Sequence, residues 1–399
     1  SIAGRPGPVY LDLPSDVINN VIDDATVKWP DFSKTLHRHR PQGDPALIEE
    51  ALKLIEGARR PVMLTGSGVL WSDAIAEVRE WLDKTGMPIY TTPQGRGVLP
   101  EDHPQEFLNA RSTALKEADL LLIVGTRLNY VFGHIAPPRV SASAKVIRID
   151  IDPADLTTSQ RVDLGIQGDA KAVMRQLLAA GGSRINAGSF ADWRGKLSSI
   201  EETKRPEAEQ AMSTSNVPIH PLRLCKEVRD FIDRDAILVV DGQEILNFGR
   251  QSIPTFNPRH RINSGTFGIM GVGMPFGVGA KAARPDKQVI VLHGDGSFGL
   301  NAMELDTATR HKLPIIVVIS LNGGWTADPK PGRELGYTRF DLFAQSLGCH
   351  GEQVEKPEDI GPALLRAKEK IKDGRPALVN VVTDFTARAT TVRFTKTVT

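Results

Sequence analysis

The residues with the clearest capacity for chemistry follow two apolar runs in the second half of the chain. Residues 289–292 lead into His293-Gly294-Asp295-Gly296-Ser297, and residues 314–321 lead into Asn322-Gly323-Gly324-Trp325. Glycine-bearing turns after strands let backbone N–H groups approach a phosphate closely. The Asp295 carboxylate, the Asn322 amide oxygen and the Gly324 carbonyl are hard oxygen ligands of the kind that Mg²⁺ prefers. The two turns together predict a combined phosphate and magnesium site.

Neighbouring parallel strands must bring these two turns to one edge of a sheet. Continuous apolar strands that alternate with helices are typical of parallel sheets covered on both faces. The pattern occurs twice, with predicted strands at residues 61–66, 88–92, 119–125 and 145–150, and again at 236–241, 288–293, 314–321 and 377–383. The predicted fold class is therefore α/β, with two Rossmann-like parallel-sheet domains.

The predicted division of the chain into domains follows from the two occurrences of this strand-and-helix pattern. Residues 1–40 hold a short strand at 7–14 and a linker, 41–182 form the first domain, 183–218 a second linker, 219–385 the second domain and 386–399 a tail. The strand at 7–14 is interpreted as the last strand of an α/β domain upstream of this chain. Two helix starts are also predicted, one at 72–86 with Ser72 or Asp73 as N-cap and one near Asn301.

Composition excludes some partners. A net charge of +1 over 399 residues gives no overall field for nucleic acid or for an anionic membrane, and no apolar run approaches 18 residues. The two cysteines, Cys225 and Cys349, lie far apart in sequence, and we expect both to be buried thiols. These features predict a cytoplasmic protein without nucleic-acid or membrane partners.

The Gly-Asp-Gly-Ser and Asn-Gly-Gly turns, 25 residues apart, resemble those of acetolactate-synthase-like enzymes that depend on thiamine diphosphate (ThDP). This resemblance implies ThDP and Mg²⁺ as cofactors and three α/β domains, the first of which, the pyrimidine-binding domain, is absent here. It implies Asp295, Asn322 and Gly324 as metal ligands and Met270 as the prop of a V-shaped cofactor. The remaining residues implied at the cofactor are Gln243, Glu244, Gly268, Gly296, Ser297 and Trp325.

A second stretch of sequence indicates a particular group of enzymes within this family. Residues 257–271, with Arg259 and Arg261, and the tail around Arg388 resemble 2-hydroxyacyl-CoA lyases and oxalyl-CoA decarboxylases. Arginine forks suit the phosphates of CoA, so these three arginines are the candidate CoA ligands. The tail is expected to close over the site as a lid. Gln243 and Glu334 are candidate catalytic residues, because the essential glutamate of the family belongs to the pyrimidine-binding domain.

The implied reaction is reversible cleavage of a 2-hydroxyacyl-CoA to formyl-CoA and an aldehyde or ketone. Oxalyl-CoA decarboxylase, acetolactate synthase and a non-enzymatic ThDP-binding regulatory or scaffold subunit remain alternatives. The loops Gly66-Ser67-Gly68 and Gly125-Thr126-Arg127 also suit ADP or another nucleotide in the first domain. Expected partners are a pyrimidine-binding domain of the same or another chain and further copies, in a homodimer or homotetramer.

Overall fold

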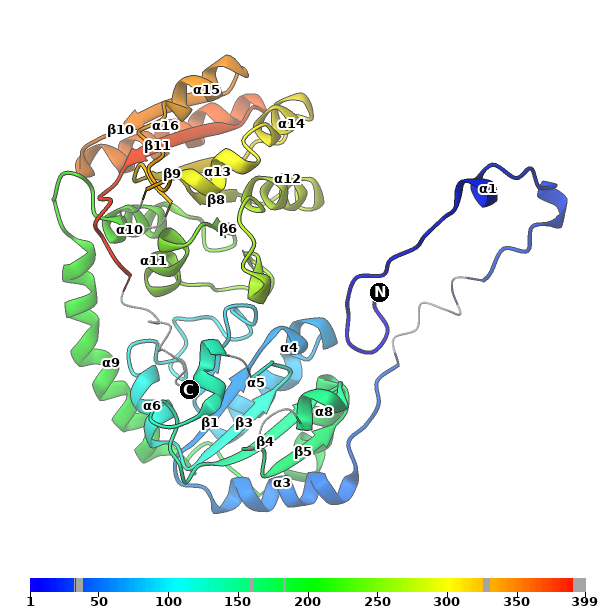
Figure 1. The fold of residues 1–399 in the computed structure, drawn as a ribbon. Helices are drawn as coiled ribbons and strands as arrows, with labels where there is room; N and C mark the ends of the chain where they lie inside the picture. The colour runs from blue at the N-terminus through cyan, green and yellow to red at the C-terminus, as the bar shows by residue number, and fades with distance from the viewer. Residues whose placement is uncertain are drawn as a thin grey trace.

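The computed structural model describes residues 1–31, 33, 39–128, 130–157, 161–181, 184–325 and 331–389. It contains two parallel sheets, each with helices on both faces, and the long helix α9 (Ala191–Met212) runs along one side and joins them (Figure 1). The prediction of an α/β fold with two parallel-sheet domains is confirmed. Within the described part of the chain, no helix is both long and apolar enough to span a bilayer.

The first sheet has the strand order β2-β1-β3-β4-β5, with all neighbours parallel. Its strands are β1 (Pro61–Thr65), β2 (Ile89–Thr91), β3 (Leu120–Val124), β4 (Lys145–Asp150) and β5 (Leu164–Gln167). The helices around it are α3 (Pro45–Gly57), α4 (Ser67–Ser72), α5 (Ile75–Thr85), α6 (Arg111–Glu117), α7 (Pro153–Thr157) and α8 (Ala170–Gly181). The chain order reverses between β1 and β3, and such switch points form ligand crevices at the carboxyl ends of the strands.

The second sheet has the order β10-β11-β9-β8-β6-β7, again all parallel. Its strands are β6 (Ile237–Asp241), β7 (Arg261–Ile262), β8 (Val289–Gly294), β9 (Ile316–Leu321), β10 (His350–Val354) and β11 (Ala377–Val382). Its helices are α10 (Pro221–Phe231), α11 (Glu244–Ser252), α12 (Gly273–Ala283), α13 (Asp295–Leu300), α14 (Glu304–Arg310), α15 (Phe340–Ser346) and α16 (Ile360–Lys370). Here the switch point lies between β6 and β8.

Short helical turns complete the described secondary structure. One α-helical turn, α1, spans Ser15–Ile18. The 3₁₀ turns are Asp24–Thr26, Tyr130–Ile135, Gly265–Phe267, Pro357–Asp359 and Ile371–Asp373. The turn at Gly265–Phe267 matters most for function, because it begins the loop that leads to Met270.

The predicted helix starts are shifted in the structure. The helix predicted at 72–86 forms as α5 over Ile75–Thr85, and its start differs because α4 ends at Ser72 and Asp73 adopts a left-handed conformation (φ 57°) that separates α4 from α5. The N-cap of α5 is instead Ala74. The helix expected near Asn301 is α14, which begins three residues later at Glu304, and a separate short helix that was not predicted, α13, begins at Asp295 with Gly294 as its N-cap. Asp295 therefore lies in the first turn of a helix rather than in a loop.

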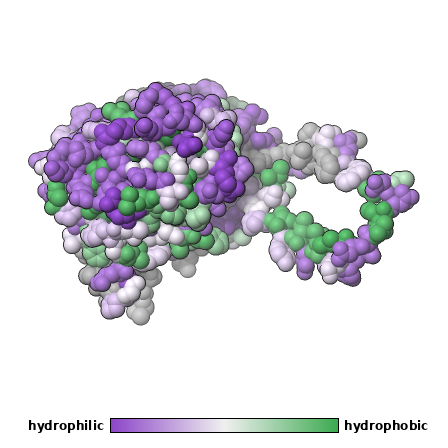
Figure 2. All heavy atoms as spheres, turned by 90° about the horizontal axis from the view of Figure 1, so that it is seen from above, coloured by the Kyte–Doolittle hydropathy of each residue, from purple (hydrophilic) through white to green (hydrophobic). Residues whose placement is uncertain are grey.

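The N-terminal segment differs from its prediction as well. Residues 7–14 form no strand, since no described strand lies beside them to take up their backbone hydrogen bonds. The apolar side chains of this projecting segment are exposed instead, including Tyr10 (86%) and Val21 (97%), and they give it its green surface in Figure 2. The segment contacts the first sheet at Arg5, which pairs with Asp152 and Asp155 at 2.9 and 2.7 Å.

A buried ion pair joins the two halves of the molecule. Arg96 and Glu101, in the loop after β2, pair with each other and have side-chain exposures of 7% and 1%. The Arg96 guanidinium also donates to the Ile253 carbonyl (2.9 Å), and Glu101 accepts from the Thr255 N–H (2.9 Å). Both outer contacts reach the segment that follows α11. The pair therefore links the first sheet to the second, and its two charged groups find hydrogen-bond partners inside the protein.

Removing one member of this pair is expected to destabilise the protein severely. Glu101→Ala removes the carboxylate that pairs directly with the buried Arg96 charge and leaves only the neighbouring Glu106 to offset it, at a cost of about 3–5 kcal/mol in the free energy of unfolding. Urea unfolding followed by tryptophan fluorescence measures this loss. The control is Asp102→Ala, which breaks a largely exposed pair with Arg234 (2.8 Å) and is expected to change stability far less. Equal effects of the two substitutions would contradict the proposed importance of the buried pair.

Candidate functional site

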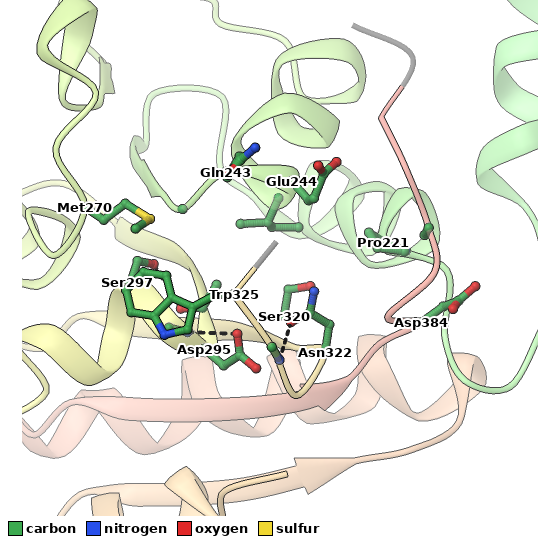
Figure 3. Close-up of a pocket in the computed structure, with 16 residues that line it drawn as sticks. Pro221, Gln243, Glu244, Met270, Asp295, Ser297, Ser320, Asn322, Trp325 and Asp384 are labelled. Carbon is green, nitrogen blue, oxygen red and sulfur yellow. Dashed lines mark hydrogen bonds between the residues drawn. The ribbon is translucent and has the colours of Figure 1, made fainter. Parts of the chain in front are cut away.

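The switch point of the second sheet holds a pocket. The loop after β6 supplies Gly242 and Gln243, and the turn after β8 supplies Asp295 and Ser297. In Figure 3, Gln243 and Glu244 line one side, opposite Asp295, Asn322 and Trp325, while Met270 and Asp384 lie at the two ends. The remaining lining residues are Pro221, Ile245, Gly294, Gly296, Ser320, Gly324 and Ala387. We call this the switch-point pocket.

Asp295 ties the two predicted turns together. Its Oδ1 accepts from the N–H of Gly296 (2.8 Å), and its Oδ2 accepts from the N–H of Gly323 (2.7 Å). The side chain is nearly inaccessible, and burial raises the pKa of this carboxyl to about 6 even though backbone N–H groups oppose the shift. The Asn322 amide oxygen accepts from the Gly324 N–H at 3.2 Å. The three residues predicted as metal ligands therefore line the same pocket.

The charged side chains that line the switch-point pocket are all acidic. Asp295, Glu244 and Asp384 line it, and no lysine or arginine is among its lining residues in the described part of the chain. Across the described ranges, no group of three or more histidine, cysteine, aspartate or glutamate side chains is arranged to hold a metal ion. A cation in this pocket would therefore be held by fewer than three of these acidic side chains, together with neutral oxygens.

Trp325 covers the turn that Asp295 begins. A β-carbon placed on Gly296 would lie 3.3 Å from the indole ring, so the ring packs directly on that glycine. Residues 323–325 pair with residues 333–335 through Trp325 N–H to Arg333 O (2.7 Å) and Leu335 N–H to Gly323 O (2.8 Å). Glu334 is exposed on the outer arm of this pairing and lines neither pocket described here. The structure therefore does not bring Glu334 to the cavity.

A second and larger pocket, the interdomain pocket, spans the two sheets and has a volume of about 820 Å³. On the first sheet it is lined by Gly68 at the start of α4 and by Gly125 and Arg127 in the loop after β3, at the switch point between β1 and β3. Gly268 lines it from the second sheet. Gly242, Gln243 and Met270 line both pockets. The two cavities therefore adjoin at these three residues.

The candidate CoA arginines lie elsewhere. Arg261 is buried (7% exposed), and its guanidinium donates to the Ile253 carbonyl at 3.3 Å. Arg259 is exposed and bridges the domains by donating to the Leu70 carbonyl at 2.6 Å. Arg388 is exposed, and none of the three lines either pocket. Arg261 differs from its expected exposure because it begins β7 and is buried near Cys225, which the local sequence pattern does not reveal.

Three other arginines line the interdomain pocket. Arg5, Arg127 and Arg250 line the interdomain pocket, together with Asp150, Asp155 and Asp169. Arg127 belongs to the Gly125-Thr126-Arg127 loop that the sequence marks as suitable for a nucleotide, whereas Arg5 and Arg250 carry no such signal. Sequence reasoning also missed Ser320 and Asp384 in the switch-point pocket.

The chain returns to the switch-point pocket near its end. Ala387 is buried and lines the pocket, and the Ala389 N–H donates to the Glu244 carboxylate at 3.1 Å. Glu244 therefore contacts the C-terminal segment, in addition to facing the pocket. The predicted lid falls mainly on residues 390–399, which lie outside the described residues.

Comparison with known proteins identifies the class that this fold and site define. The profile "Thiamine pyrophosphate enzyme, central domain" matches residues 48–177. The profile "Thiamine pyrophosphate enzyme, C-terminal TPP binding domain" matches residues 246–381. The chain is 34% identical over 360 residues to a probable acetolactate synthase of Mycobacterium bovis. The aligned residues cover 86% of this chain and 62% of that protein.

Two further relatives differ in their named activities. A 2-hydroxyacyl-CoA lyase of Oryza sativa is 30% identical over 419 residues, covering 96% of this chain and 70% of the lyase. An oxalyl-CoA decarboxylase of Escherichia coli is 29% identical over 417 residues, covering 99% of this chain and 71% of the decarboxylase. The chain thus belongs to the thiamine-pyrophosphate (thiamine-diphosphate) enzymes, and it spans about two thirds of the length of these relatives.

The raised pKa of Asp295 predicts a pH-dependent effect of Asp295→Asn. Because the folded pKa (about 6) exceeds the ordinary value of 3.8, the folded protein holds this proton more tightly than the unfolded chain. Ionisation of Asp295 therefore reduces the stability of the ligand-free wild type as the pH rises from about 4 to about 6. Asparagine does not ionise, so the variant is expected to gain up to about 3 kcal/mol relative to the wild type across that range.

Urea unfolding of both proteins at pH 4.5 and pH 7.5, without metal or cofactor, measures this change. Replacing a carboxylate oxygen by an amide group also changes the free energy of unfolding by an amount that does not depend on pH. This amount cancels, because the test compares the stability difference between variant and wild type at the two pH values. A stability difference that is the same at both pH values would refute a raised pKa at Asp295.

Proposed function

We propose that this protein is a ThDP- and Mg²⁺-dependent carbon–carbon lyase that splits a 2-hydroxyacyl-CoA into formyl-CoA and an aldehyde or ketone. The observation that supports this most directly is the junction of the two pockets at Gly242, Gln243 and Met270. A cofactor in the switch-point pocket would meet a cavity of about 820 Å³, which suits a bulky thioester better than a small keto acid. The name of the rice relative agrees with this substrate class.

The residues present fit the cofactor. Asp295 is a buried carboxylate with backbone N–H partners, and no cationic side chain lines its pocket among the described residues. We assign Mg²⁺ to Asp295, the Asn322 amide oxygen and the Gly324 carbonyl, a small ligand set that leaves room for phosphate oxygens. Gly296, Ser297 and Trp325 would border the diphosphate, whereas Gln243, Glu244, Gly268 and Met270 would border the rest of the cofactor.

The chain's own residues bind and orient the reactants. Bound ThDP supplies the nucleophilic carbon and the electron sink on which this cleavage depends. Gln243 lines both pockets, and in this proposal its amide would donate a hydrogen bond to the substrate carbonyl or hydroxyl. The C1–C2 bond breaks, the hydroxyl proton leaves as the carbonyl product forms, and C1 takes up a proton to become formyl-CoA. Atoms and electrons balance without an oxidant.

The interdomain pocket is the proposed site for the CoA end. Arg5, Arg127 and Arg250 replace Arg259, Arg261 and Arg388 as the proposed phosphate ligands, since these three line the cavity. The exposed indole of Trp71 also borders the cavity and offers a surface for an adenine ring. The same groups suit ADP or another free nucleotide, which we retain as an optional occupant of the first-sheet side.

A complete site requires a pyrimidine-binding domain, of the same or another chain, and we propose a homodimer or homotetramer. Exposed apolar side chains on the second sheet's helices and loops support an interface there. They are Phe267, Ile269, Phe276, Leu300, Met303, Leu335, Tyr337 and Leu342. The exposed N-terminal side chains at residues 9–22 offer a further apolar contact for the preceding domain.

The proposed reaction is tested with the protein in its natural full-length form. A 2-hydroxyacyl-CoA, oxalyl-CoA and pyruvate are each incubated with enzyme, ThDP and Mg²⁺, and products are followed by mass spectrometry. We expect formyl-CoA and an equimolar carbonyl product from the first substrate. Carbon dioxide release from oxalyl-CoA would favour a decarboxylase, acetolactate from pyruvate would favour the synthase, and ThDP binding without any turnover would favour the regulatory or scaffold subunit.

The metal assignment is tested separately by calorimetry. Asp295→Ala is expected to abolish measurable Mg²⁺-dependent ThDP binding, because the metal loses its only anionic protein ligand. The matched control, Asp306→Ala, removes a partly exposed carboxylate on α14 that pairs with Arg310, and this variant is expected to bind ThDP as the wild type does. Unchanged ThDP affinity in Asp295→Ala would exclude Asp295 as the metal ligand.

A further inference from the structure

The backbone of the loop that carries Met270 donates hydrogen bonds to a carboxylate that lines neither pocket. Asp241 is the last residue of β6 and is 3% exposed. Its Oδ2 accepts hydrogen bonds from the N–H groups of Gly271 and Gly273, both at 2.8 Å. These two N–H groups lie one and three residues after Met270. One buried oxygen atom therefore fixes the backbone that presents Met270 to the switch-point pocket.

The same loop is also tied to the helix that begins at Asp295. Asn301, directly after α13, donates from Nδ2 to the Gly271 carbonyl at 2.7 Å. Gly271 adopts φ +91°, which L side chains rarely adopt, and a β-carbon there would lie 2.9 Å from Leu300. The position of Met270 relative to Asp295 thus depends on both hydrogen bonds of Gly271.

His293 closes this network on the other side of Asp241. The ring is fully buried and packs on Gly273, where an added β-carbon would lie 2.4 Å from Nε2. Its Nδ1 is 3.1 Å from the Ser297 hydroxyl and 3.8 Å from Asp241 Oδ2. Burial lowers the pKa of His293 to about 3, so the ring is neutral near pH 7. A proton on Nδ1 would face both oxygens, and Nε2 has no hydrogen-bond partner among the described residues.

We propose that Asp241 is a positioning residue of the cofactor site, which sets Met270 against Asp295 through the N–H groups of Gly271 and Gly273. This inference rests on the proposed function, since Met270 is taken to contact ThDP. Asp241 acts through Met270, because its own side chain borders neither cavity. His293 and Asn301 restrain the same loop from opposite sides of it.

The first test needs no cofactor. The full-length protein is labelled with ¹³C-methyl methionine, and the Met270 resonance is assigned by its loss in Met270→Leu. We expect Asp241→Ala to shift and broaden this resonance and Asp241→Asn to restore much of its position, because one amide oxygen can still accept both N–H groups. Asn301→Ala, at an exposed position, tests the same loop in a variant that does not depend on the buried carboxylate. An unmoved Met270 resonance in the Asp241 and Asn301 variants would overturn the proposal.

The second test is a double-mutant cycle on ThDP affinity, measured by calorimetry with Mg²⁺. Asp241→Ala is expected to weaken binding by about tenfold or more, as for a lost hydrogen bond to a charged group. In a Met270→Ala background the same substitution is expected to have almost no effect, whereas a general loss of stability would act equally in both backgrounds. Additive effects overturn the positioning role. Absence of ThDP binding in the wild type would instead refute the proposed function, and the resonance test would still decide the role of Asp241.

Discussion

Arg96 and Glu101 form a buried pair at the boundary between the two sheets, and the arrangement of both pockets depends on it. The interdomain pocket is lined by loops from the first sheet and by residues 242–250 and 264–270 of the second. Its shape is therefore set by how the sheets are held together. The pair reaches Ile253 and Thr255, directly after α11, the helix whose first residue borders the switch-point pocket. A shift at this boundary would move Gln243 and Met270 together, because both lie on the second-sheet side.

The parts of the fold that the sequence predicts are those determined by local pattern. Buried strands of a parallel sheet are continuously apolar, and β8 and β9 could be placed within two residues of their observed ends. Parallel neighbours end at the same edge, which is why Asp295 and Gly323, 28 residues apart, could be expected to meet. The rule that ligands bind at switch points then applies to both sheets.

The parts that could not be predicted depend on tertiary neighbours. Arg259 and Arg261 lie two residues apart, yet one bridges to Leu70 in the other half and the other is buried against Ile253. The charge of an arginine is visible in the sequence, but its burial is decided by segments distant in the chain. The left-handed residue Asp73 is a similar case, since its capping preference suggested a helix start while the observed backbone ends a helix there. Residues 7–14 show the pattern of a strand, but a strand forms only where a partner strand is present.

In the proposed enzyme, the distribution of charge makes binding of the diphosphate depend on binding of the metal. Asp295, Glu244 and Asp384 line the switch-point pocket without any lysine or arginine among its described lining residues, whereas the interdomain pocket has Arg5, Arg127 and Arg250 beside Asp150, Asp155 and Asp169. Like charges about 4 Å apart repel by roughly 4 kcal/mol near a protein surface, so a bare diphosphate would meet a strongly unfavourable field. A divalent cation reverses the sign of that field at Asp295 and supplies the attraction that no described side chain of this pocket provides. In the proposed enzyme, the diphosphate would therefore bind together with the metal, whereas the phosphates of the proposed CoA thioester would meet Arg5, Arg127 and Arg250 in the interdomain pocket.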